Sequence, residues 1–341
     1  MDKIKVIFLC GERSPWGYSH LEPLLHEPAF QVVAVVLATE ERWKTFRKAL
    51  SGQDITIDWK HRMKQLVKNV LRPIFPNKSN TEHVLHILEQ EKIPVVWCDD
   101  ANATQAIERF RGFAPDILFS AAYPQIFKAQ LLAAFPQGAF NSHPSLLPRC
   151  RGAHPVFWAI ASGENKSGST IHIMTPTLDQ GNIVAQVEVE LLSVETRSRL
   201  YANLIDTVPL LLTRFASFLT TLEAKSKPQN DNEATYFRND RAIHRRIFWS
   251  EMSAVQIHNL VRACDGSAYF WYGHQRVIVI SVETSIANRN LTNGLIVPAG
   301  TVVDINNDNP VVATSNGFIT LTKIKTPRLS RFRFGIGMVL M

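Results

Sequence analysis

Residues 94–121, PVVWCDDANATQAIERFRGFAPDILFSA, hold two short apolar runs on either side of an amphipathic stretch. The runs Pro94–Cys98 and Asp116–Ala121 have the length and composition of buried strands. Between them, Ala103–Arg111 has the periodicity of a helix. A strand, a helix and a further strand in so short a segment are typical of a parallel sheet whose faces are covered by helices.

The same alternation continues on both sides of this segment. The apolar runs Ile4–Cys10 and Gln31–Ala38 predict strands, and His83–Gln90 and Phe127–Ala134 predict helices. We therefore expect an α/β fold with a mostly parallel sheet in this part of the chain.

The pattern extends through the middle of the chain. Residues 168–174 (GSTIHIM) and 182–191 (NIVAQVEVEL) predict two further strands. A long helical stretch follows over Arg197–Ala224, and we expect it to break near Pro209. The first domain is therefore predicted to cover residues 1–224.

A polar segment precedes a second, smaller domain. Residues 225–234, KSKPQNDNEA, contain Pro and lack aliphatic anchors, which predicts a linker over 225–240. Ala254–Ala263 predicts one helix, and short strands are expected in the sequences RVIVISVET, GTVVDI, NPVVAT and GFITLTKI. These elements predict a β-rich domain over 241–330, followed by a tail at 331–341.

Positive charge is concentrated in one part of the chain. The 341 residues include 37 Lys and Arg and 30 Asp and Glu, a net charge of +7. Residues 39–80 alone contain ten basic and four acidic side chains, so the rest of the chain is almost neutral. Within this basic insertion, residues 59–73 (WKHRMKQLVKNVLRP) predict an amphipathic helix. Such a helix can contact nucleic-acid phosphates or an anionic membrane, and it can also be an ordinary surface helix.

The composition excludes several classes of protein. Hydrophobic residues make up 45% and charged residues 20%, which is typical of a globular chain and not of a disordered one. No apolar run approaches the ~20 residues of a membrane span, and residues 1–14 lack the apolar core of a signal peptide. The four cysteines form no CxxC pair, so we expect reduced thiols, no thiolate zinc site and a cytoplasmic location.

One stretch is rich in residues that carry out chemistry. Residues 139–155, AFNSHPSLLPRCRGAHP, combine Asn, His, Ser and Arg with three prolines that forbid a continuous helix or central strand. They predict a rigid loop, and open α/β sheets place their sites in loops at strand ends. A second turn, Leu178–Gly181 (LDQG), follows between predicted strands.

Three side chains in these turns suit the attack of an amine on an activated acyl group. In an extended segment, Asn141 and His143 point to the same side. The Asn141 amide can donate to a developing oxyanion and the His143 imidazole can accept a proton, while the Asp179 carboxylate can orient the imidazole and stabilise its protonated form. No GxSxG turn surrounds Ser142 or Ser145, so a serine nucleophile is not expected.

Two other interpretations start from the same residues. A metal site is the first, and its ligands would be His143, His154, His172 and Asp179. Their spacing matches no metal-binding motif such as HExxH, so we predict no metal. In the second, His143 is a structural residue of the loop without a chemical role.

The loop and turn sequences resemble a known enzyme family. The motifs FNSHPSLLPRCRGAHPVFWAI (140–160), STIHIM (169–174) and LDQG (178–181) are together similar to those of the 10-formyltetrahydrofolate-dependent formyltransferases. This family includes methionyl-tRNA formyltransferase and the nucleotide-amino-sugar N-formyltransferases. NEATYF (232–237) and NLVRA (259–263) also look like family features. The resemblance implies a Rossmann-like formyltransferase domain with a mostly parallel sheet and a smaller, barrel-like C-terminal domain.

The resemblance also implies roles for individual residues. His143 would be the general base that accepts a proton from the attacking amine, Asn141 would stabilise the oxyanion, and Asp179 would favour the protonated form of His143. The cosubstrate would be 10-formyltetrahydrofolate, with no metal and no covalent intermediate. Its predicted lining residues are Gln125, Ile126, Phe127, Ser145, Leu146, Leu147, Pro148, Ala153, Thr175, Pro176, Thr177 and Leu178.

The acceptor amine is predicted from departures within the family. Cys150 stands where the family commonly has an aromatic residue, and residues 10–15 (CGERSP) replace the start typical of the tRNA enzymes. The second departure, together with RGAHPVFWAI (151–160), favours a small amine, in particular a nucleotide-linked amino sugar. Methionyl-tRNA is the alternative, since the tRNA enzymes have a basic loop near the position of residues 39–80. A further alternative is a formyltransferase-like binding protein without activity, and the oligomeric state stays open.

Overall fold

The chain folds into two compact units. The structure, a computed structural model, describes residues 2–341 apart from 13, 40–41, 43–78, 286–296 and 326–333. The first unit consists of Met1–Pro155, Lys166–Val189 and Tyr201–Asn239, and the second of Val156–Asn165, Glu190–Leu200 and Asp240–Met341. The helix predicted over 59–73 lies outside the described residues.

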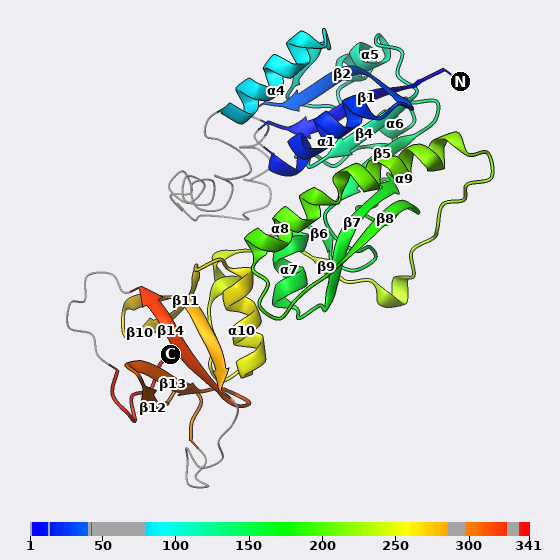
Figure 1. Cartoon of the computed structure of the whole chain (residues 1–341). Helices are drawn as coiled ribbons and strands as arrows, with labels where there is room; N and C mark the ends of the chain where they lie inside the picture. The colour runs from blue at the N-terminus through cyan, green and yellow to red at the C-terminus, as the bar shows by residue number, and fades with distance from the viewer. Residues whose placement is uncertain (1, 13, 40–41, 43–78, 286–296, 326–333) are drawn as a thin grey trace. The chain divides into compact units, whose positions relative to one another are not determined.

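The first unit is built on a seven-stranded sheet with the order β3-β2-β1-β4-β5-β7-β8 (Figure 1). Its strands are β1 (Ile4–Gly11), β2 (Phe30–Ala38), β3 (Val95–Cys98), β4 (Ile117–Ala121), β5 (Ala139–His143), β7 (Lys166–Ile173) and β8 (Ile183–Glu190). Neighbouring strands from β3 to β5 run parallel, and β7 pairs with β5 in the antiparallel direction. The prediction of a mostly parallel α/β sheet is confirmed.

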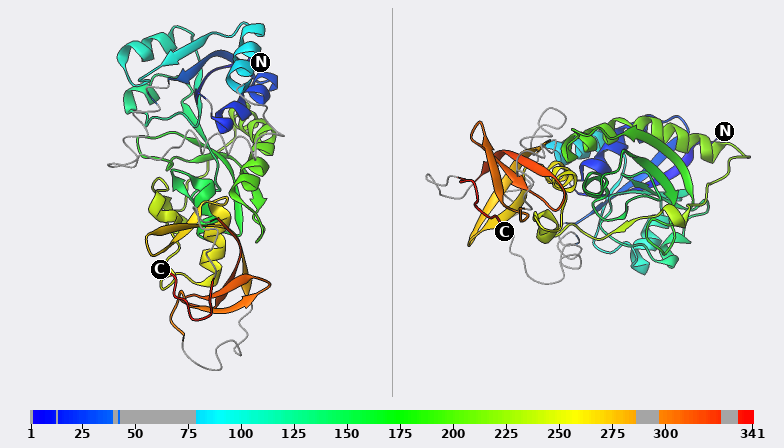
Figure 2. Two further views of the ribbon diagram at one scale, coloured as in Figure 1. Left: turned by 90° about the vertical axis from the view of Figure 1, so that its left-hand side faces the viewer. Right: turned by 90° about the horizontal axis from the view of Figure 1, so that it is seen from below.

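Helices cover both faces of this sheet (Figure 2). On one face, α5 (Thr104–Arg111) and α6 (Ala129–Leu132) contribute Ile107, Phe110 and Leu131 to a core of buried side chains that includes alternate residues of β1, β2 and β4. Strands that are covered on both sides have to be apolar along their whole length, which explains the continuous apolar runs of the sequence.

On the other face, α1 (Pro15–His26) and α9 (Val208–Thr220) pack side by side. Phe215 of α9 lies against Phe119 and Phe140, with ring centroids 5.4 and 4.9 Å apart. This aromatic cluster fixes α9 against β4 and β5, the two strands that lead to the predicted site.

Several helix boundaries differ from the sequence prediction. α4 (Ser79–Gln90) begins earlier than predicted, and α6 is shorter than predicted at both ends, with Phe127 buried in the core before the helix starts. The long helical stretch is divided into α8 (Arg197–Asp206) and α9, which bend by 44°. The break predicted near Pro209 lies at Thr207, and Pro209 itself is in the first turn of α9, where its missing N–H breaks no helical hydrogen bond.

The loop predicted for residues 139–155 is wrong in its first part. Ala139–His143 form β5, which hydrogen-bonds to β4 on one side and to β7 on the other. The strand ends where Pro144 removes a backbone donor. The remaining elements of the chain are β6 (Arg151–Gly152), α7 (Pro155–Ala161), η1 (Asp231–Glu233), β9 (Tyr236–Phe237) and η2 (Ala242–Arg245).

The second unit contains a five-stranded antiparallel sheet with the order β10-β11-β14-β13-β12. Its strands are β10 (Ala268–Tyr272), β11 (Gln275–Ser285), β12 (Val302–Asn306), β13 (Asn309–Ala313) and β14 (Phe318–Lys325). α10 (Ala254–Ala263), which has the predicted bounds, packs on β11 through a buried apolar side. The predicted β-rich fold of this part of the chain is confirmed.

Residues near the C-terminus connect the two edge strands of this sheet. The backbone of Met341 exchanges hydrogen bonds with Trp271 of β10, and the Val302 N–H of β12 donates to the Met338 carbonyl at 2.8 Å. These bonds join β10 to β12 and give the second unit its barrel-like closure.

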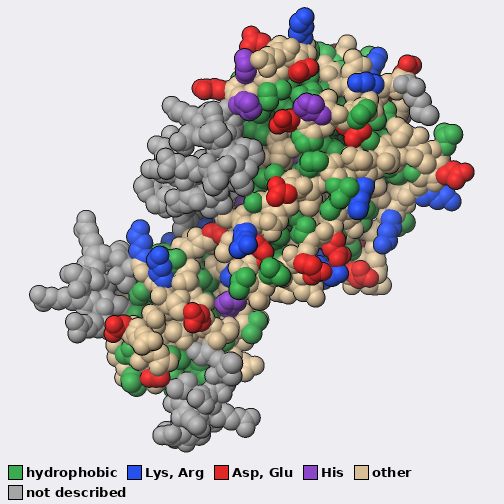
Figure 3. Space-filling view, in the orientation of Figure 1, with side chains coloured by type: hydrophobic (Ala, Val, Ile, Leu, Met, Phe, Trp, Pro, Cys, Tyr) green, Lys and Arg blue, Asp and Glu red, His purple; other side chains and the backbone are tan. Residues whose placement is uncertain are grey.

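The surface carries charges of both signs. The face in Figure 3 shows basic and acidic side chains scattered among apolar ones. Within the described residues, no single helix has the length and apolar composition to cross a membrane, whereas the bent pair of α8 and α9 passes the same test as a pair.

Candidate active site

The predicted site lies at the carboxyl edge of the parallel strands. The sheet order places β2 and β3 on one side of β1, and β4 and β5 on the other, so the winding of the chain reverses between β1 and β4 (Figure 1). Open α/β sheets bind ligands outside the carboxyl ends of their strands at such a point. β5 ends at this edge with His143, and the predicted loop continues from it.

The last residues of β5 point alternately to the two faces of the sheet. Ser142 points toward α1, where its hydroxyl lies 2.7 Å from His20 Nε2 and its carbonyl accepts a hydrogen bond from Trp16 Nε1. Because side chains alternate along a strand, Asn141 and His143 share the opposite side. The contacts of Ser142 with α1 fix this end of β5 on the sheet face opposite Asn141 and His143.

The imidazole of His143 lies between a carboxylate and a backbone carbonyl. Its Nδ1 is 3.7 Å from Asp179 Oδ2, and its Nε2 is 3.0 Å from the Cys150 carbonyl oxygen. Because a carbonyl oxygen can only accept, the neutral ring carries its hydrogen on Nε2 and its lone pair on Nδ1. A proton that binds to Nδ1 therefore comes to lie beside the carboxylate.

Asp179 is a buried carboxylate with several partners. Its Oδ2 accepts a hydrogen bond from the Gly152 N–H at 2.9 Å, and its Oδ1 lies 3.6 Å from His172 Nε2. Burial raises the pKa of Asp179, but the charge of His143, the side chain of His172 and the Gly152 N–H together outweigh burial and lower this pKa to about 2. Asp179 is therefore ionised at neutral pH.

Asn141 is oriented by His172, its cross-strand neighbour. The antiparallel register of β5 and β7 places the two residues opposite each other. His172 Nε2 lies 3.3 Å from the Asn141 amide nitrogen, and its Nδ1 lies 2.9 Å from the Ile173 carbonyl oxygen. The Asn141 amide can donate to an oxyanion. From the sequence, His172 is only a candidate metal ligand. Its pairing with Asn141 could not be predicted, because it depends on the register of two strands.

Glycines allow the surrounding segments to approach closely. Gly152 has a φ of +96°, and a Cβ at this position would lie 2.1 Å from the Phe237 carbonyl oxygen. A Cβ on Gly181 would lie 1.8 Å from the Ile173 carbonyl oxygen. Larger residues at these positions would separate β6 from β9, or the turn that carries Asp179 from β7.

The residues predicted to line a folate site in the loop surround the end of β5. Ser145 is buried, and its hydroxyl donates to the Arg149 carbonyl at 2.8 Å. Leu147 is buried as well, whereas Leu146, Pro148 and Ala153 are half-buried. The Leu147 carbonyl accepts from Gln186 Nε2 at 2.9 Å, which ties the loop to β8.

The other predicted lining residues differ in exposure. Thr175, Pro176, Thr177 and Leu178 are exposed and directly precede Asp179. Ile126 is exposed too, whereas Phe127 is packed in the core and Gln125 hydrogen-bonds to the Ala101 N–H and to Asp100. The structure therefore brings the turn before Asp179 close to His143, while Phe127 points into the core.

Metal-ligating side chains do not form a binding group in the described part of the chain. Among the described residues, no group of three or more His, Cys, Asp or Glu side chains is placed to hold a metal ion. His154, one of the four ligands of the metal interpretation, is exposed. All four cysteines are buried, and none forms a disulfide.

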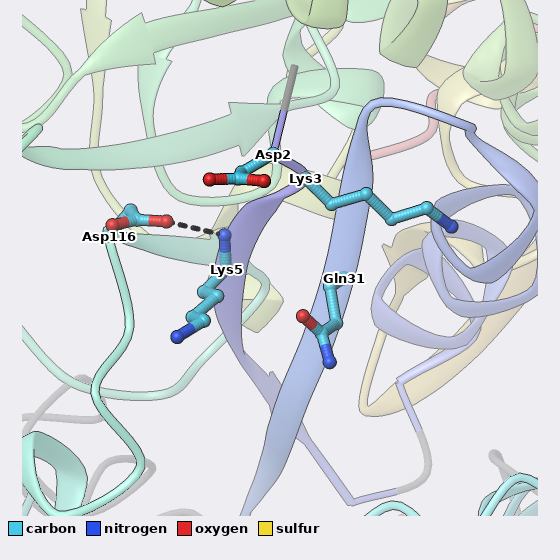
Figure 4. A pocket seen from close by; sticks show the side chains of 5 residues that line it. All are labelled: Asp2, Lys3, Lys5, Gln31 and Asp116. Atoms are coloured by element: carbon cyan, nitrogen blue, oxygen red, sulfur yellow. Dashed lines mark hydrogen bonds between the residues drawn. The ribbon is translucent and has the colours of Figure 1, made fainter.

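A polar hollow lies at the opposite ends of the strands. Its lining residues are Asp2, Lys3, Lys5, Gln31 and Asp116, at the amino ends of β1, β2 and β4 (Figure 4). The Lys5 N–H donates to Asp116 Oδ2 at 2.7 Å across it. The hollow is separated from the candidate site by the length of the sheet.

Both units match known protein families. Residues 4–214 match the family described as formyl transferase, and residues 241–331 match the formyl transferase C-terminal domain. The two matches cover most of the chain, including β1 to β8 and every residue of the candidate site up to Asp179.

Solved structures of related fold extend over nearly the whole chain. WlaRD, a sugar 3N-formyl transferase crystallised with dTDP and 5-N-formyl-THF, is 17% identical over 96% of this chain and 100% of its own, with a TM-score of 0.59. The N-formyltransferase from Helicobacter canadensis, in complex with folinic acid and dTDP-3-aminofucose, is 20% identical over 93% of this chain and 98% of its own, with a TM-score of 0.57.

A longer protein shares the fold as well. HypX from Aquifex aeolicus, in a variant form, is 14% identical over 95% of this chain, with a TM-score of 0.51. The chain spans 46% of the length of HypX. At these identities the structural comparisons establish the fold.

Proposed function

The chain belongs to the formyl transferase family, and we propose that it transfers a formyl group from 10-formyltetrahydrofolate to a primary amine. The observation that carries this proposal is the arrangement of Asn141, His143 and Asp179 at the carboxyl edge of the sheet. An amide donor, a base and an ionised carboxylate lie within one group of contacts there.

The proposed reaction uses each of the three side chains. The amine nitrogen attacks the formyl carbon, and the carbonyl oxygen becomes an oxyanion that accepts a hydrogen bond from the Asn141 amide. The amine proton passes to Nδ1 of His143, where the ionised Asp179 stabilises the imidazolium. The oxyanion then collapses to the carbonyl of the new amide, the bond from the formyl carbon to N10 of the folate breaks, and N10 takes up the proton from His143, which returns to its neutral form. The products are the N-formylated amine and tetrahydrofolate.

The folate is proposed to bind along the loop and turn that flank His143. The contributing residues would be 145–148 and Ala153 of the loop, Thr175–Leu178 of the turn, and 125–127 after β4. Leu178 and Ile126, which are 38% and 60% exposed, offer apolar surface for a planar ring system. This assignment places the formyl group beside Asn141 and His143.

The proposed acceptor is a nucleotide-linked amino sugar. This choice is supported by the extent of the structural likeness, because the chain covers nearly the whole of a sugar 3N-formyl transferase and of an N-formyltransferase. One of these is in complex with dTDP-3-aminofucose and the other was crystallised with dTDP.

One observation favours a second acceptor, methionyl-tRNA. Residues 39–80 carry ten of the 37 basic side chains of the protein and only four acidic ones. Such a segment can neutralise several phosphates of a nucleic acid, and it can equally hold the protein near an anionic membrane.

The first test is a formyl-transfer assay that follows the release of tetrahydrofolate. Methionyl-tRNA is compared with a panel of nucleotide-linked amino sugars as acceptors. We expect turnover with an amino sugar and a loss of at least about 10³-fold in kcat for His143→Ala, since this variant lacks the base that accepts the amine proton.

Two controls accompany the assay. Binding of a stable folate is measured for the wild type and His143→Ala, because folate binding without turnover in both would indicate a binding protein without activity. The exposed variant His83→Ala is the matched control and should retain full activity. Absence of turnover with every amine would contradict the proposed function.

A further inference from the structure

Gln229 lies in the polar segment between α9 and the second unit, and it uses both ends of its side-chain amide. The segment is part of the first unit, where the backbone of Lys227 exchanges two hydrogen bonds with Ile183 of β8. Gln229 follows two residues later, and its side chain contacts both the turn that carries Asp179 and the loop that contains Arg151.

One end of the amide holds the turn that carries Asp179. The Gln229 Nε2 donates to the Asp179 carbonyl and to the Gly181 carbonyl, each at 2.8 Å. Asp179 has a φ of +55°, a backbone conformation that is unfavourable for a residue other than glycine. Two hydrogen bonds from one side chain therefore stabilise the turn in the conformation that directs the carboxylate inward.

The other end of the amide holds the loop that contains Gly152. The Gln229 Oε1 accepts from Arg151 Nε at 3.0 Å and from the terminal guanidinium nitrogen at 2.8 Å. Arg151 is 5% exposed, and its guanidinium also pairs with Asp231 at 2.9 Å. The next residue, Gly152, donates its N–H to the Asp179 carboxylate at 2.9 Å.

These contacts connect Gln229 to Asp179 in two ways, one direct and one through the loop. Gln229 binds the backbone of Asp179 directly, and it binds Arg151, whose neighbour Gly152 binds the side chain of the same aspartate. The distance between Asp179 and His143 is 3.7 Å, so a small displacement of the turn changes their electrostatic interaction strongly.

We propose that Gln229 is a positioning residue that sets the Asp179 carboxylate against His143 by joining the turn to the loop. This inference rests on the proposed function, in which Asp179 stabilises protonated His143. Gln229 acts through Asp179 and has no contact with His143 or Asn141 among the hydrogen bonds of the described residues.

The decisive variant is Gln229→Met, which keeps the length of the side chain and removes both polar ends. We expect kcat for formyl transfer to fall roughly 10- to 100-fold, because displacements of about 1 Å in a catalytic group have effects of this size. The matched control is Glu233→Gln, an isosteric change on the same segment whose carboxylate contacts Asn230. The control should keep wild-type kcat.

A double-mutant cycle separates positioning from general loss of structure. If Gln229 acts through Asp179, then Gln229→Met has little further effect on kcat in an Asp179→Asn background. Equal fold-losses in both backgrounds would overturn the proposal, because they would mean that the two residues act independently. Gln229→Glu is the second variant, for use where Gln229→Met does not fold; it keeps an acceptor for Arg151 and loses the donor to the turn.

A readout without substrate keeps this inference separate from the proposed function. Hydrogen exchange of the Gly152 amide reports on its bond to the Asp179 carboxylate. We expect at least about tenfold faster exchange in Gln229→Met and wild-type exchange in Glu233→Gln. Unchanged exchange in Gln229→Met would overturn the inference, whereas an inactive wild type would overturn the proposed function and leave the exchange result to decide the role of Gln229.

Discussion

At the scale of single residues, the site depends on keeping one buried carboxylate ionised. Asp179 is only 5% exposed, and burial alone would favour its neutral form. The rings of His143 and His172 and the N–H of Gly152 surround the two oxygens and reverse this effect, so that the pKa of Asp179 falls to about 2. The charge needed beside a protonated imidazole is therefore present before any substrate binds.

The lowered pKa predicts how acid affects stability. An ordinary aspartate, as in the unfolded chain, has a pKa of 3.8, whereas the pKa of Asp179 in the folded chain is about 2. Ionisation of Asp179 therefore stabilises the folded state. The stabilisation, about 2 kcal/mol, is complete above pH 4 and is lost as the pH falls toward 2. Asp179→Asn should lack this part of the pH dependence when urea unfolding is measured from pH 5 to pH 2.

A surface variant provides the comparison. Glu108→Gln, on an exposed position of α5, should keep the wild-type slope of unfolding free energy against pH. If Asp179→Asn and Glu108→Gln gave the same slope below pH 4, the charge interactions assigned to Asp179 would be wrong.

At the scale of elements, α1 holds the end of β5 in place. His20 is fully buried on α1; its Nδ1 donates to the Trp16 carbonyl at 2.7 Å, and burial lowers its pKa to about 4. The ring is therefore neutral at pH 7, and its Nε2 accepts from the Ser142 hydroxyl. Because Ser142 lies between Asn141 and His143, the helix and the site face of the strand are coupled.

This contact predicts a non-additive pair of substitutions. Ser142→Ala removes the donor and leaves Nε2 of His20 buried without a partner, which should cost about 1–3 kcal/mol of stability. The double variant Ser142→Ala with His20→Phe should be destabilised by less than the sum of the two single variants, because it leaves no unpaired polar atom in this contact. Thermal and urea unfolding at pH 7 measure all three. Additive losses would mean that the hydrogen bond does not couple the two elements.

The elements show how far sequence patterns determine this fold. α10 has the predicted bounds, and β1 and β2 extend the predicted strands by one residue each, because long periodic runs bounded by turn residues leave little choice. β5 was missed because the prolines that follow it suggested a loop from residue 139 onward. β5 lies inside the sheet because it pairs with β4 and β7. The residue pattern of one segment does not predict with which other strands that segment pairs.

The candidate site was predictable to a similar degree. Alternation along an extended segment predicts that Asn141 and His143 share a side. The grouping of Asp179 with them was a hypothesis from its chemistry, which the resemblance to a family supported, because no sequence pattern places two distant turns together. The pairing of His172 with Asn141 depends on the antiparallel register of β5 and β7. The role of Gln229 could not be predicted from the sequence, since the polar residues around it are typical of a linker and its partners are far away in sequence.

At the scale of the whole molecule, charge distribution distinguishes the two candidate acceptors. The chain has a net charge of +7, and residues 39–80 contribute nearly all of it. An acceptor with two phosphates can release few counterions on binding, so its kcat/KM should fall by about tenfold at most between 50 and 200 mM salt. A tRNA acceptor that contacts about six phosphates would lose on the order of 10³-fold over the same range.

The same argument predicts the effect of charge reversal in the basic insertion. For an amino-sugar acceptor, the triple variant Lys60→Glu, Lys64→Glu and Lys68→Glu should keep kcat/KM within about twofold at 150 mM salt, because a small acceptor with two phosphates has few charges that could interact with these lysines. For methionyl-tRNA the variant should lose at least about 100-fold and show a shallower salt slope, since fewer phosphates are neutralised.

A charge-matched control decides whether net charge or its location matters. Reversal of the exposed Lys3, Lys92 and Lys225 changes the net charge by the same amount outside the insertion. Steady-state rates for both acceptors are compared across the salt series. Equal losses for the two triple variants would indicate a non-specific effect of net charge, whereas a loss confined to the insertion, together with steep salt dependence, would make a nucleic acid the acceptor and contradict the amino-sugar proposal.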